Sequence, residues 1–268
     1  MIIPVALTIA GSDSGGGAGV QADLRTFARL GVHGTAAITA VTAQNLFGVR
    51  EVSGLEPTAV TAQIAAVLEG FEVGAVKTGM LWRGATARAV ADALGRVGAP
   101  LVVDPVLSAT RGGPLLDEVA ALSALLPRAA LITPNLDEAA ALLGEGALAE
   151  GAMERAARDL GRRHGCAVLL KGGHLAGDPV DLLSWEEGIV RWRHPRVAGV
   201  DTHGTGCVLS AAITALLARG HGLVEACAGG LGFVLQALSR PTILPGGRAV
   251  LGIDQATPDA SLLVREAG

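Results

Sequence analysis

Short apolar segments alternate with segments of helical spacing along almost the whole chain, and no other feature constrains the fold as strongly. Six apolar runs are predicted as buried strands, at residues 4–11, 35–42, 73–80, 100–105, 129–135 and 166–171. Strands that alternate with helices favour one mostly parallel sheet with helices packed on both of its faces. We therefore predict an α/β fold with three layers, α/β/α.

The segments between these strands have the spacing of apolar residues that is typical of helices. Helices are predicted at residues 20–30, 58–70, 85–97, 115–126, 136–143 and 153–164, with Thr58 in position to cap the second of them. Residues 180–185 and 189–194 alternate and are predicted as a β-hairpin at one edge of the sheet. Two further helices are predicted to end near residues 219 and 238. Because the chain shows no linker or internal repeat, residues 1–268 are predicted to form a single domain.

The composition argues against several classes of protein. The net charge of −4 and the lack of a basic stripe give no reason to expect a nucleic-acid partner. The N-terminus lacks the basic segment of a signal peptide, and no apolar run of membrane-spanning length is free of Gly, Pro and charge. Three scattered cysteines fit neither a disulfide framework nor a zinc site. We expect a cytoplasmic protein that binds neither nucleic acid nor membrane.

One stretch indicates phosphate chemistry. Residues 200–207 are small, polar and Gly-rich, and they lead into the apolar helical pattern of residues 208–213. A Gly-Thr-Gly turn at the start of a helix can direct several backbone N–H groups toward one anion, and the helix dipole adds positive charge there. Cys207 lies where a thiol pKa tends to fall. The glycines also fit a plain turn, and Cys207 also fits a small buried apolar residue.

A second Gly-rich loop, at residues 12–19, invites a dinucleotide-binding interpretation. A Gly-x-Gly-x-x-Gly fingerprint that began at Gly15 would need glycine at position 20, where Val20 stands. The second predicted strand ends in Thr-Ala-Gln-Asn rather than in the acidic residue that would bind a ribose. The chain also lacks the Gly-Lys-Ser/Thr sequence of a Walker-type loop. These absences disfavour a dehydrogenase.

Polar residues recur where the predicted parallel strands end, and ligands bind at that edge of such sheets. The residues of interest are the loop at 12–19, Gln44 with Asn45, Lys77 to Met80, Asp104, Asn135 with Glu138, Lys171 and the turn at 204–207. Each also has an ordinary structural explanation: Asp104 and Gln44-Asn45 fit turns, Glu138 a helix N-terminus, Met80 core packing and His203 a solvated loop. Their coincidence at one edge favours a binding site.

Phosphoryl transfer requires the groups that this edge would bring together. Carboxylates must hold Mg²⁺, a cation must meet the nucleotide phosphates, and donors must surround the transferred group. Asp104 and Glu138 suit the metal, and Lys171 suits the phosphates. The candidate anion-binding and catalytic groups are Gly204, Thr205, Gly206, Cys207 and Lys171, with Cys207 as the candidate general base.

Seven short motifs carry these residues: GSDSGGGAGVQAD at 11–23, VTAQN at 41–45, VKTGM at 76–80, VVDPV at 102–106, TPNLDE at 133–138, KGGH at 171–174 and DTHGTGC at 201–207. Together, and in this order, they resemble the motifs of the hydroxymethylpyrimidine/phosphomethylpyrimidine kinases of thiamine biosynthesis. Those kinases belong to the ribokinase-like superfamily. The resemblance covers about residues 5–240 and implies a ribokinase-like fold.

The resemblance implies a homodimeric kinase that uses ATP and Mg²⁺. Its substrate would be a small pyrimidine, 4-amino-5-hydroxymethyl-2-methylpyrimidine, and then the monophosphate of that pyrimidine. The residues it implies for the pyrimidine are Gly11, Asp23, Gln44 and Met80, and those for the nucleotide are Asp104, Asn135, Lys171 and Thr205. Cys207 stands where the wider superfamily has a catalytic aspartate, which is the variant of the pyrimidine kinases.

Two departures from the family pattern and three rival functions remain open. Ser-Ala-Thr-Arg-Gly stands at 108–112 where relatives often have Ser-Thr-Ser-Gly, and Arg111 fits either a phosphate contact or a solvated position. Residues 252–255 replace a stretch that is His- and Gly-rich in the family. The rivals are a pyridoxine or pyridoxal kinase, whose substrate is also a flat ring with a hydroxymethyl arm, a non-catalytic pyrimidine-binding sensor, and the disfavoured dehydrogenase.

Overall fold

The computed structural model describes residues 2–95, 97–108, 113, 115–173, 175 and 177–266. The strands are β1 (Val5–Asp13), β2 (His33–Asn45), β3 (Gly48–Gly54), β4 (Val73–Thr78), β5 (Leu101–Val103), β6 (Leu131–Ile132), β7 (Ala167–Leu170), β8 (Val180–Trp185), β9 (Gly188–Arg193), β10 (Thr242–Ile243), β11 (Ala249–Val250) and β12 (Val264–Glu266). The α-helices are α1 (Gly19–Arg29), α2 (Pro57–Gly70), α3 (Gly84–Ala93), α4 (Leu136–Leu143), α5 (Met153–His164), α6 (Thr205–Ala218) and α7 (Leu223–Ser239). The 3₁₀-helices are η1 (Val119–Ala124), η2 (Leu126–Arg128), η3 (Glu150–Ala152), η4 (Ile253–Gln255) and η5 (Ala260–Leu262).

Ten of the described strands form one sheet, in the order β12-β9-β8-β7-β6-β5-β4-β1-β2-β3. The strands from β7 to β2 in this order are parallel to their neighbours, which confirms the predicted parallel sheet. The predicted hairpin is β8–β9, but it does not form the edge, because β12 pairs antiparallel with β9. At the other end of the sheet, β3 pairs antiparallel with β2.

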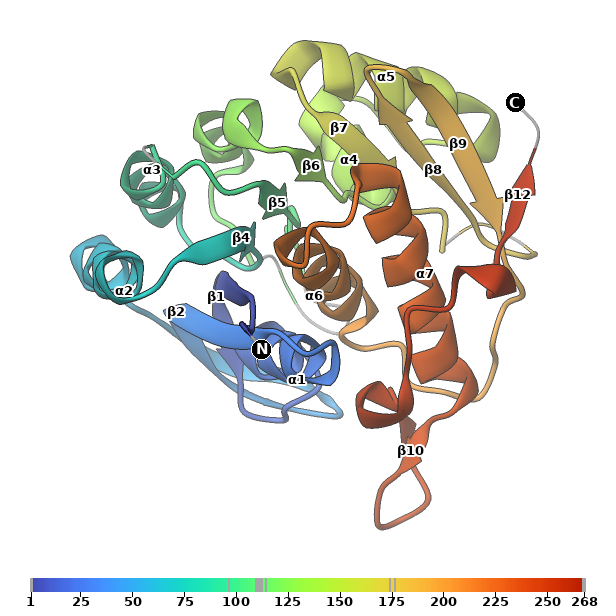
Figure 1. Cartoon of the computed structure of the whole chain (residues 1–268), viewed down its shortest axis with the longest axis horizontal. Helices are drawn as coiled ribbons and strands as arrows, with labels where there is room; N and C mark the ends of the chain where they lie inside the picture. The colour runs from blue at the N-terminus through green and yellow to red at the C-terminus, as the bar shows by residue number, and fades with distance from the viewer. Residues whose placement is uncertain are drawn as a thin grey trace.

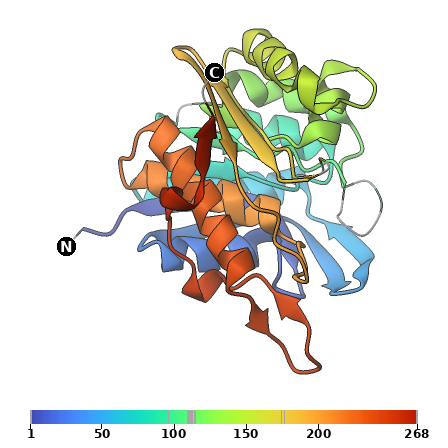
Figure 2. The same ribbon diagram turned by 90° about the vertical axis from the view of Figure 1, so that its right-hand side faces the viewer.

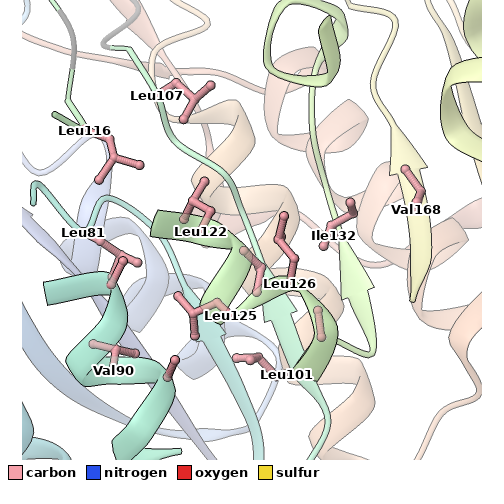
Figure 3. Close-up of a cluster of buried hydrophobic side chains, with 14 of the residues drawn as sticks. Leu81, Val90, Leu101, Leu107, Leu116, Leu122, Leu125, Leu126, Ile132 and Val168 are labelled. Atoms are coloured by element: carbon pink, nitrogen blue, oxygen red, sulfur yellow. The ribbon is translucent and has the colours of Figure 1, made fainter. Parts of the chain in front are cut away.

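Helices cover both faces of the sheet, as predicted. In Figure 1, α1, α6 and α7 lie on one side of the strands, and α2, α3, α4 and α5 lie on the other. The apolar side chains divide in the same way, with one buried cluster on the face of α2 to α5 and two clusters around α1, α6 and α7. Figure 3 shows the first cluster, which includes Val90 of α3, Ile132 of β6, Leu126 of η2 and Leu125 at the junction of η1 and η2. The small ribbon β10–β11 projects from the body (Figure 2).

The helices α4 and α5 have the predicted ends, because the residues that cap them are their neighbours in the sequence. The Asn135 side chain accepts from the N–H of Glu138, and the Glu138 carboxylate accepts from the N–H of Asn135, so α4 begins with a capping box. Both α4 and α5 end at a glycine in the left-handed conformation, Gly144 and Gly165, where L-residues are strained.

Two local predictions are wrong. Thr58 does not cap α2, because the helix begins at Pro57 with Glu56 at the N-cap, and Thr58 lies inside its first turn. The segment predicted as a helix at 115–126 forms the 3₁₀-helices η1 and η2 instead. Pro127 lies in η2 and has no N–H to continue an α-helical ladder.

The parallel strands direct their carboxyl ends to one edge of the sheet. The loop after β1, the end of β2, and the residues after β4, β5, β6 and β7 therefore meet there, beside the start of α6. Within the described part of the chain, no helix has both the length and the apolar character needed to cross a membrane.

Candidate active site

A lysine and two carboxylates meet beyond the ends of β5, β6 and β7. Lys171 Nζ lies 3.2 Å from Asp104 Oδ1 and 3.8 Å from Glu138 Oε2. Two hydroxyls also lie against Asp104: Thr133 Oγ1 donates to its Oδ1 at 3.2 Å, and Ser210 Oγ lies 3.3 Å from its Oδ2. The sequence prediction that Asp104, Glu138 and Lys171 lie together is confirmed.

Burial and charge act against each other in this cluster. Burial raises the pKa of Glu138, the nearby Asp104 charge adds to that, and Lys171 opposes it, which leaves the pKa of Glu138 at about 7. Burial would lower the pKa of Lys171, but Asp104 and Glu138 outweigh it and raise that pKa. The lysine therefore remains a cation at neutral pH, beside a glutamate whose pKa is raised.

The first turn of α6 lies directly against this cluster. A methyl group at Gly206 would lie 3.3 Å from Lys171 Nζ and 3.7 Å from Asp104 Oδ2. Gly204 is the N-cap with a φ of 84°, and a methyl group there would lie 1.9 Å from the carbonyl oxygen of Gly17. The close approach of backbone to backbone requires glycine at position 204.

The turn offers fewer free donors than its sequence suggests. The N–H of Thr205 donates to the carbonyl of Thr202 at 3.2 Å, so it is already in use. The N–H groups of Gly206 and Cys207 have no hydrogen-bond acceptor among the described residues. They lie in the first turn of a helix, beside a lysine ammonium, which is an arrangement suited to an anion.

The predicted low pKa of Cys207 is wrong. Burial raises the pKa of this thiol to about 11, with the Lys77 ammonium lowering it and the carboxylates of Asp23 and Asp104 raising it further. Although the residue keeps some exposed surface, its sulfur is surrounded by protein atoms and two negative charges. The start of a helix and a nearby cation do not compensate for this burial, so Cys207 is a protonated thiol at neutral pH.

The residues predicted for the pyrimidine are arranged around the ends of β1, β2 and β4. A methyl group at Gly11 would lie 2.9 Å from Met80 Sδ, so the methionine packs on the bare backbone of Gly11. Gly19, at the start of α1, packs its backbone against the carbonyl of Gly11. Gln44 is the penultimate residue of β2 and is partly exposed at the same edge. Gly11, Met80 and Gln44 are thus placed where a ring could contact them.

Asp23 is placed differently from its prediction. Its carboxylate is fully buried, with Oδ1 2.8 Å from Lys77 Nζ and Oδ2 accepting from Thr8 Oγ1 at 2.6 Å. Burial raises the pKa of Asp23, and Lys77 opposes it. In this arrangement Asp23 does not reach a ligand directly, because its side chain has no exposed surface.

Asn135 also has a structural task, because its side chain caps α4. Its predicted contact with the nucleotide stays a prediction, as does that of Thr205. Arg111 and His174 lie outside the described residues. The atypical segment at 252–255 forms η4 against α1, where Arg25 pairs with Asp254 at 2.9 Å.

The sequence did not indicate that Asp13 and His203 pair with each other in the site. His203, considered a solvated loop residue, lies with its Nε2 3.1 Å from Asp13 Oδ2 and 2.8 Å from Gln44 Nε2. Asp13 accepts N–H groups from Gly15, Gly17 and Ala18 at 2.8 to 3.1 Å. Burial alone would raise the pKa of Asp13, but the bonds from His203, Gly15 and Ala18 outweigh it and lower that pKa.

The donor set fits a magnesium ion held partly by water. Among the described residues, no group of three or more His, Cys, Asp or Glu side chains is placed to hold a metal by itself. Asp104 and Glu138 are hard oxygen donors, and each is already near Lys171. Mg²⁺ typically takes one or two carboxylates and fills its remaining positions with water and phosphate oxygens.

Comparison with known proteins gives one consistent result. A family model described as phosphomethylpyrimidine kinase matches residues 13–250. The chain is 49% identical over 240 residues to the hydroxymethylpyrimidine/phosphomethylpyrimidine kinase of Rhizobium meliloti (strain 1021), covering 88% of this chain and 90% of that protein.

Two solved structures are similar over most of their length. The phosphomethylpyrimidine kinase of Clostridium difficile 630 has a TM-score of 0.77 and 38% identity, over 88% of this chain and 99% of that one. The pyridoxal kinase of Staphylococcus aureus, in complex with AMP-PCP and pyridoxal, has a TM-score of 0.84 and 30% identity, over 94% of each chain. The latter carries an ATP analogue and a flat ring on this fold.

Proposed function

The chain belongs to the phosphomethylpyrimidine kinase family, and from this premise we propose how its site acts. It transfers the γ-phosphoryl group of ATP to the hydroxymethyl group of 4-amino-5-hydroxymethyl-2-methylpyrimidine, and then a second phosphoryl group to the monophosphate. The observation that carries the proposal is the approach of Gly206 to Lys171 and Asp104, with the open N–H groups of Gly206 and Cys207 beside them.

These groups suit the phosphate side of the reaction. Lys171 neutralises the nucleotide phosphates, and the N–H groups of Gly206 and Cys207 donate to the transferred phosphoryl group, aided by the dipole of α6. Asp104 and Glu138 hold Mg²⁺, Glu138 most simply through water. When bound, the ion neutralises charge on the phosphate oxygens.

The acceptor side is formed by residues from β1, β2 and β4. Met80 packs on the ring, and the bare backbone of Gly11 leaves room for the methionine side chain. The Gln44 amide offers a donor and an acceptor to the aminopyrimidine edge. Phosphoryl transfer leaves little covalent chemistry to the protein, so positioning and charge supply most of the rate. No thiolate base is required.

An acceptor series tests this function. The protein is assayed for ADP release with the hydroxymethylpyrimidine, its monophosphate and pyridoxal in parallel. We expect both pyrimidines to support turnover, with pyridoxal weaker. Pyridoxal kinase activity is the second candidate, favoured by the likeness to the Staphylococcus aureus enzyme. Turnover with pyridoxal alone would favour that candidate, and no acceptor-dependent ADP release would contradict a kinase. The homodimer and the cytoplasmic location stay predictions.

Cys207→Ala lowers kcat by less than about tenfold, because loss of a true general base costs roughly 10²- to 10⁴-fold. With a pKa of about 11, the thiol is already protonated in the assay. The kcat of the wild-type protein and the variant is measured between about pH 6 and 9, below the range in which this thiol ionises. The two profiles should have the same shape, with Cys166→Ala, remote from the site, as the control. If kcat rises with pH in the wild-type protein but not in the variant, Cys207 acts as a general base after all.

Glu138→Gln raises the Mg²⁺ concentration needed for half-maximal activity by about tenfold or more, because a charged ligand becomes neutral. Glutamine keeps the capping box, so α4 is retained. The control is Asp137→Asn, the same loss of charge at an exposed neighbour. Activity is titrated with Mg²⁺ at constant ATP, and equal shifts in the two variants would remove Glu138 from the metal site.

A further inference from the structure

Three segments that are distant in the sequence meet at one imidazole. Asp13 ends β1, Gln44 lies at the end of β2, and His203 lies in the loop before α6. His203 Nε2 is 3.1 Å from Asp13 Oδ2 and 2.8 Å from Gln44 Nε2. All three side chains are at least partly buried. This network therefore contains the amide that is proposed to read the substrate ring.

The hydrogen on His203 is fixed by Asp13. The low pKa of Asp13 keeps its carboxylate ionised, and an ionised carboxylate only accepts hydrogen bonds. Nε2 of His203 must therefore carry a proton and donate it to Asp13. A protonated Nε2 has no lone pair left, so the end of the Gln44 amide that faces it must be the oxygen.

Thr42 leads to the same orientation independently. Its hydroxyl has one proton and lies 2.9 Å from the carbonyl of Ser12 and 3.2 Å from the other end of the Gln44 amide. The Ser12 carbonyl only accepts, so it takes the proton, and Thr42 offers a lone pair to Gln44. The amide end at Thr42 must be the NH₂ group. The two ends of an amide have the same shape, and their hydrogen-bond partners decide which is which.

We propose that Asp13 and His203 are positioning residues that fix the orientation of the Gln44 amide, and with it the order of donor and acceptor shown to the substrate ring. The inference rests on the proposed function. Once oriented, the amide has one free lone pair on oxygen and one free N–H. An aminopyrimidine edge has a donor amino group beside an acceptor ring nitrogen, and its 4-oxo analogue has the reverse order. A fixed amide therefore distinguishes the two rings.

His203→Phe is the variant that tests this role, because a phenyl ring keeps the approximate shape of the imidazole but has no N–H group to fix the orientation of the Gln44 amide. We expect the KM for the aminopyrimidine to rise about tenfold, while the KM for ATP and kcat stay within about threefold. The ratio of kcat/KM for the 4-amino substrate to that for 5-hydroxymethyl-2-methylpyrimidin-4-one should fall about tenfold or more. The control is His221→Phe, at a histidine that pairs with Glu225 away from this network.

A second measurement reads the network without any turnover. Nitrogen-15 NMR of the wild-type protein reports which ring nitrogens of His203 carry a proton, and we expect one on Nε2. An Nε2 atom without a proton would overturn the inference, as would a His203→Phe variant in which both pyrimidines weaken equally or neither changes. A wild-type protein that phosphorylates neither pyrimidine would contradict the proposed function instead, and the NMR result would still decide the state of His203.

Discussion

Lys77→Met lowers the free energy of unfolding by about 3–5 kcal/mol, the usual cost of leaving one member of a buried ion pair without its partner. Lys77 and Asp23 are 2.8 Å apart, and neither side chain has any exposed surface. Burial would lower the pKa of Lys77, but Asp23, Cys207 and Asp104 outweigh it and raise that pKa, so the lysine is charged. Methionine fills a similar volume but leaves the Asp23 carboxylate unpaired. Urea unfolding followed by circular dichroism measures the loss.

A second variant and a control make this result interpretable. Adding Asp23→Asn to Lys77→Met removes the remaining charge and keeps an oxygen for the Thr8 hydroxyl, so it should restore about 2 kcal/mol or more. Arg88→Met breaks the exposed pair with Glu118 and should cost less than about 1 kcal/mol. Equal costs for Lys77→Met and Arg88→Met would show that the buried pair contributes no more than a surface pair.

Gly204→Ala lowers kcat/KM by about 10²- to 10³-fold, the range seen when donors to a transition state are displaced. The new methyl group would lie 1.9 Å from the carbonyl oxygen of Gly17, and position 204 has a φ of 84°. The backbone of the turn must move, and the N–H groups of Gly206 and Cys207 move with it. Steady-state kinetics measures the loss, after circular dichroism has shown that the variant is folded.

The chain offers a closely matched control for this variant. Gly220 follows the end of α6 with a φ of 85°, and a methyl group there would contact no other atom within 4 Å. Gly220→Ala therefore carries the same conformational strain, about 1–2 kcal/mol, without the clash. It should lose stability but keep its kcat/KM. If the two variants lose activity to the same extent, backbone strain rather than the position of the turn is responsible.

Elements with local signals were predictable from the sequence. The bounds of α4 and α5 follow from apolar spacing and from the glycines that end both helices. The strands β3 and β12 were missed, because each is mostly exposed and is stabilised by pairing at an edge of the sheet. Such strands depend on a partner that is distant in sequence, and their own residues carry little apolar pattern.

The candidate site also has a part that the sequence could predict and a part that it could not. Asp104, Glu138, Lys171 and the turn before α6 could be placed together, because strand ends of a parallel sheet share one edge. Two outcomes depended on three-dimensional burial, which the sequence does not contain: the high pKa of Cys207 and the interior position of Asp23. The bond between Asp13 and His203 joins residues 190 positions apart, and the only local signal was an aspartate before a Gly-rich loop.

Phosphorus-31 NMR of the wild-type protein with ATP, Mg²⁺ and the hydroxymethylpyrimidine tests the phosphoryl transfer most directly. We expect the ATP signals to decline as ADP and one phosphomonoester appear in equal amounts, followed by a diphosphate ester when ATP is in excess. Unchanged ATP, or ADP accompanied only by free phosphate, would contradict the claim that this site transfers a phosphoryl group to the pyrimidine.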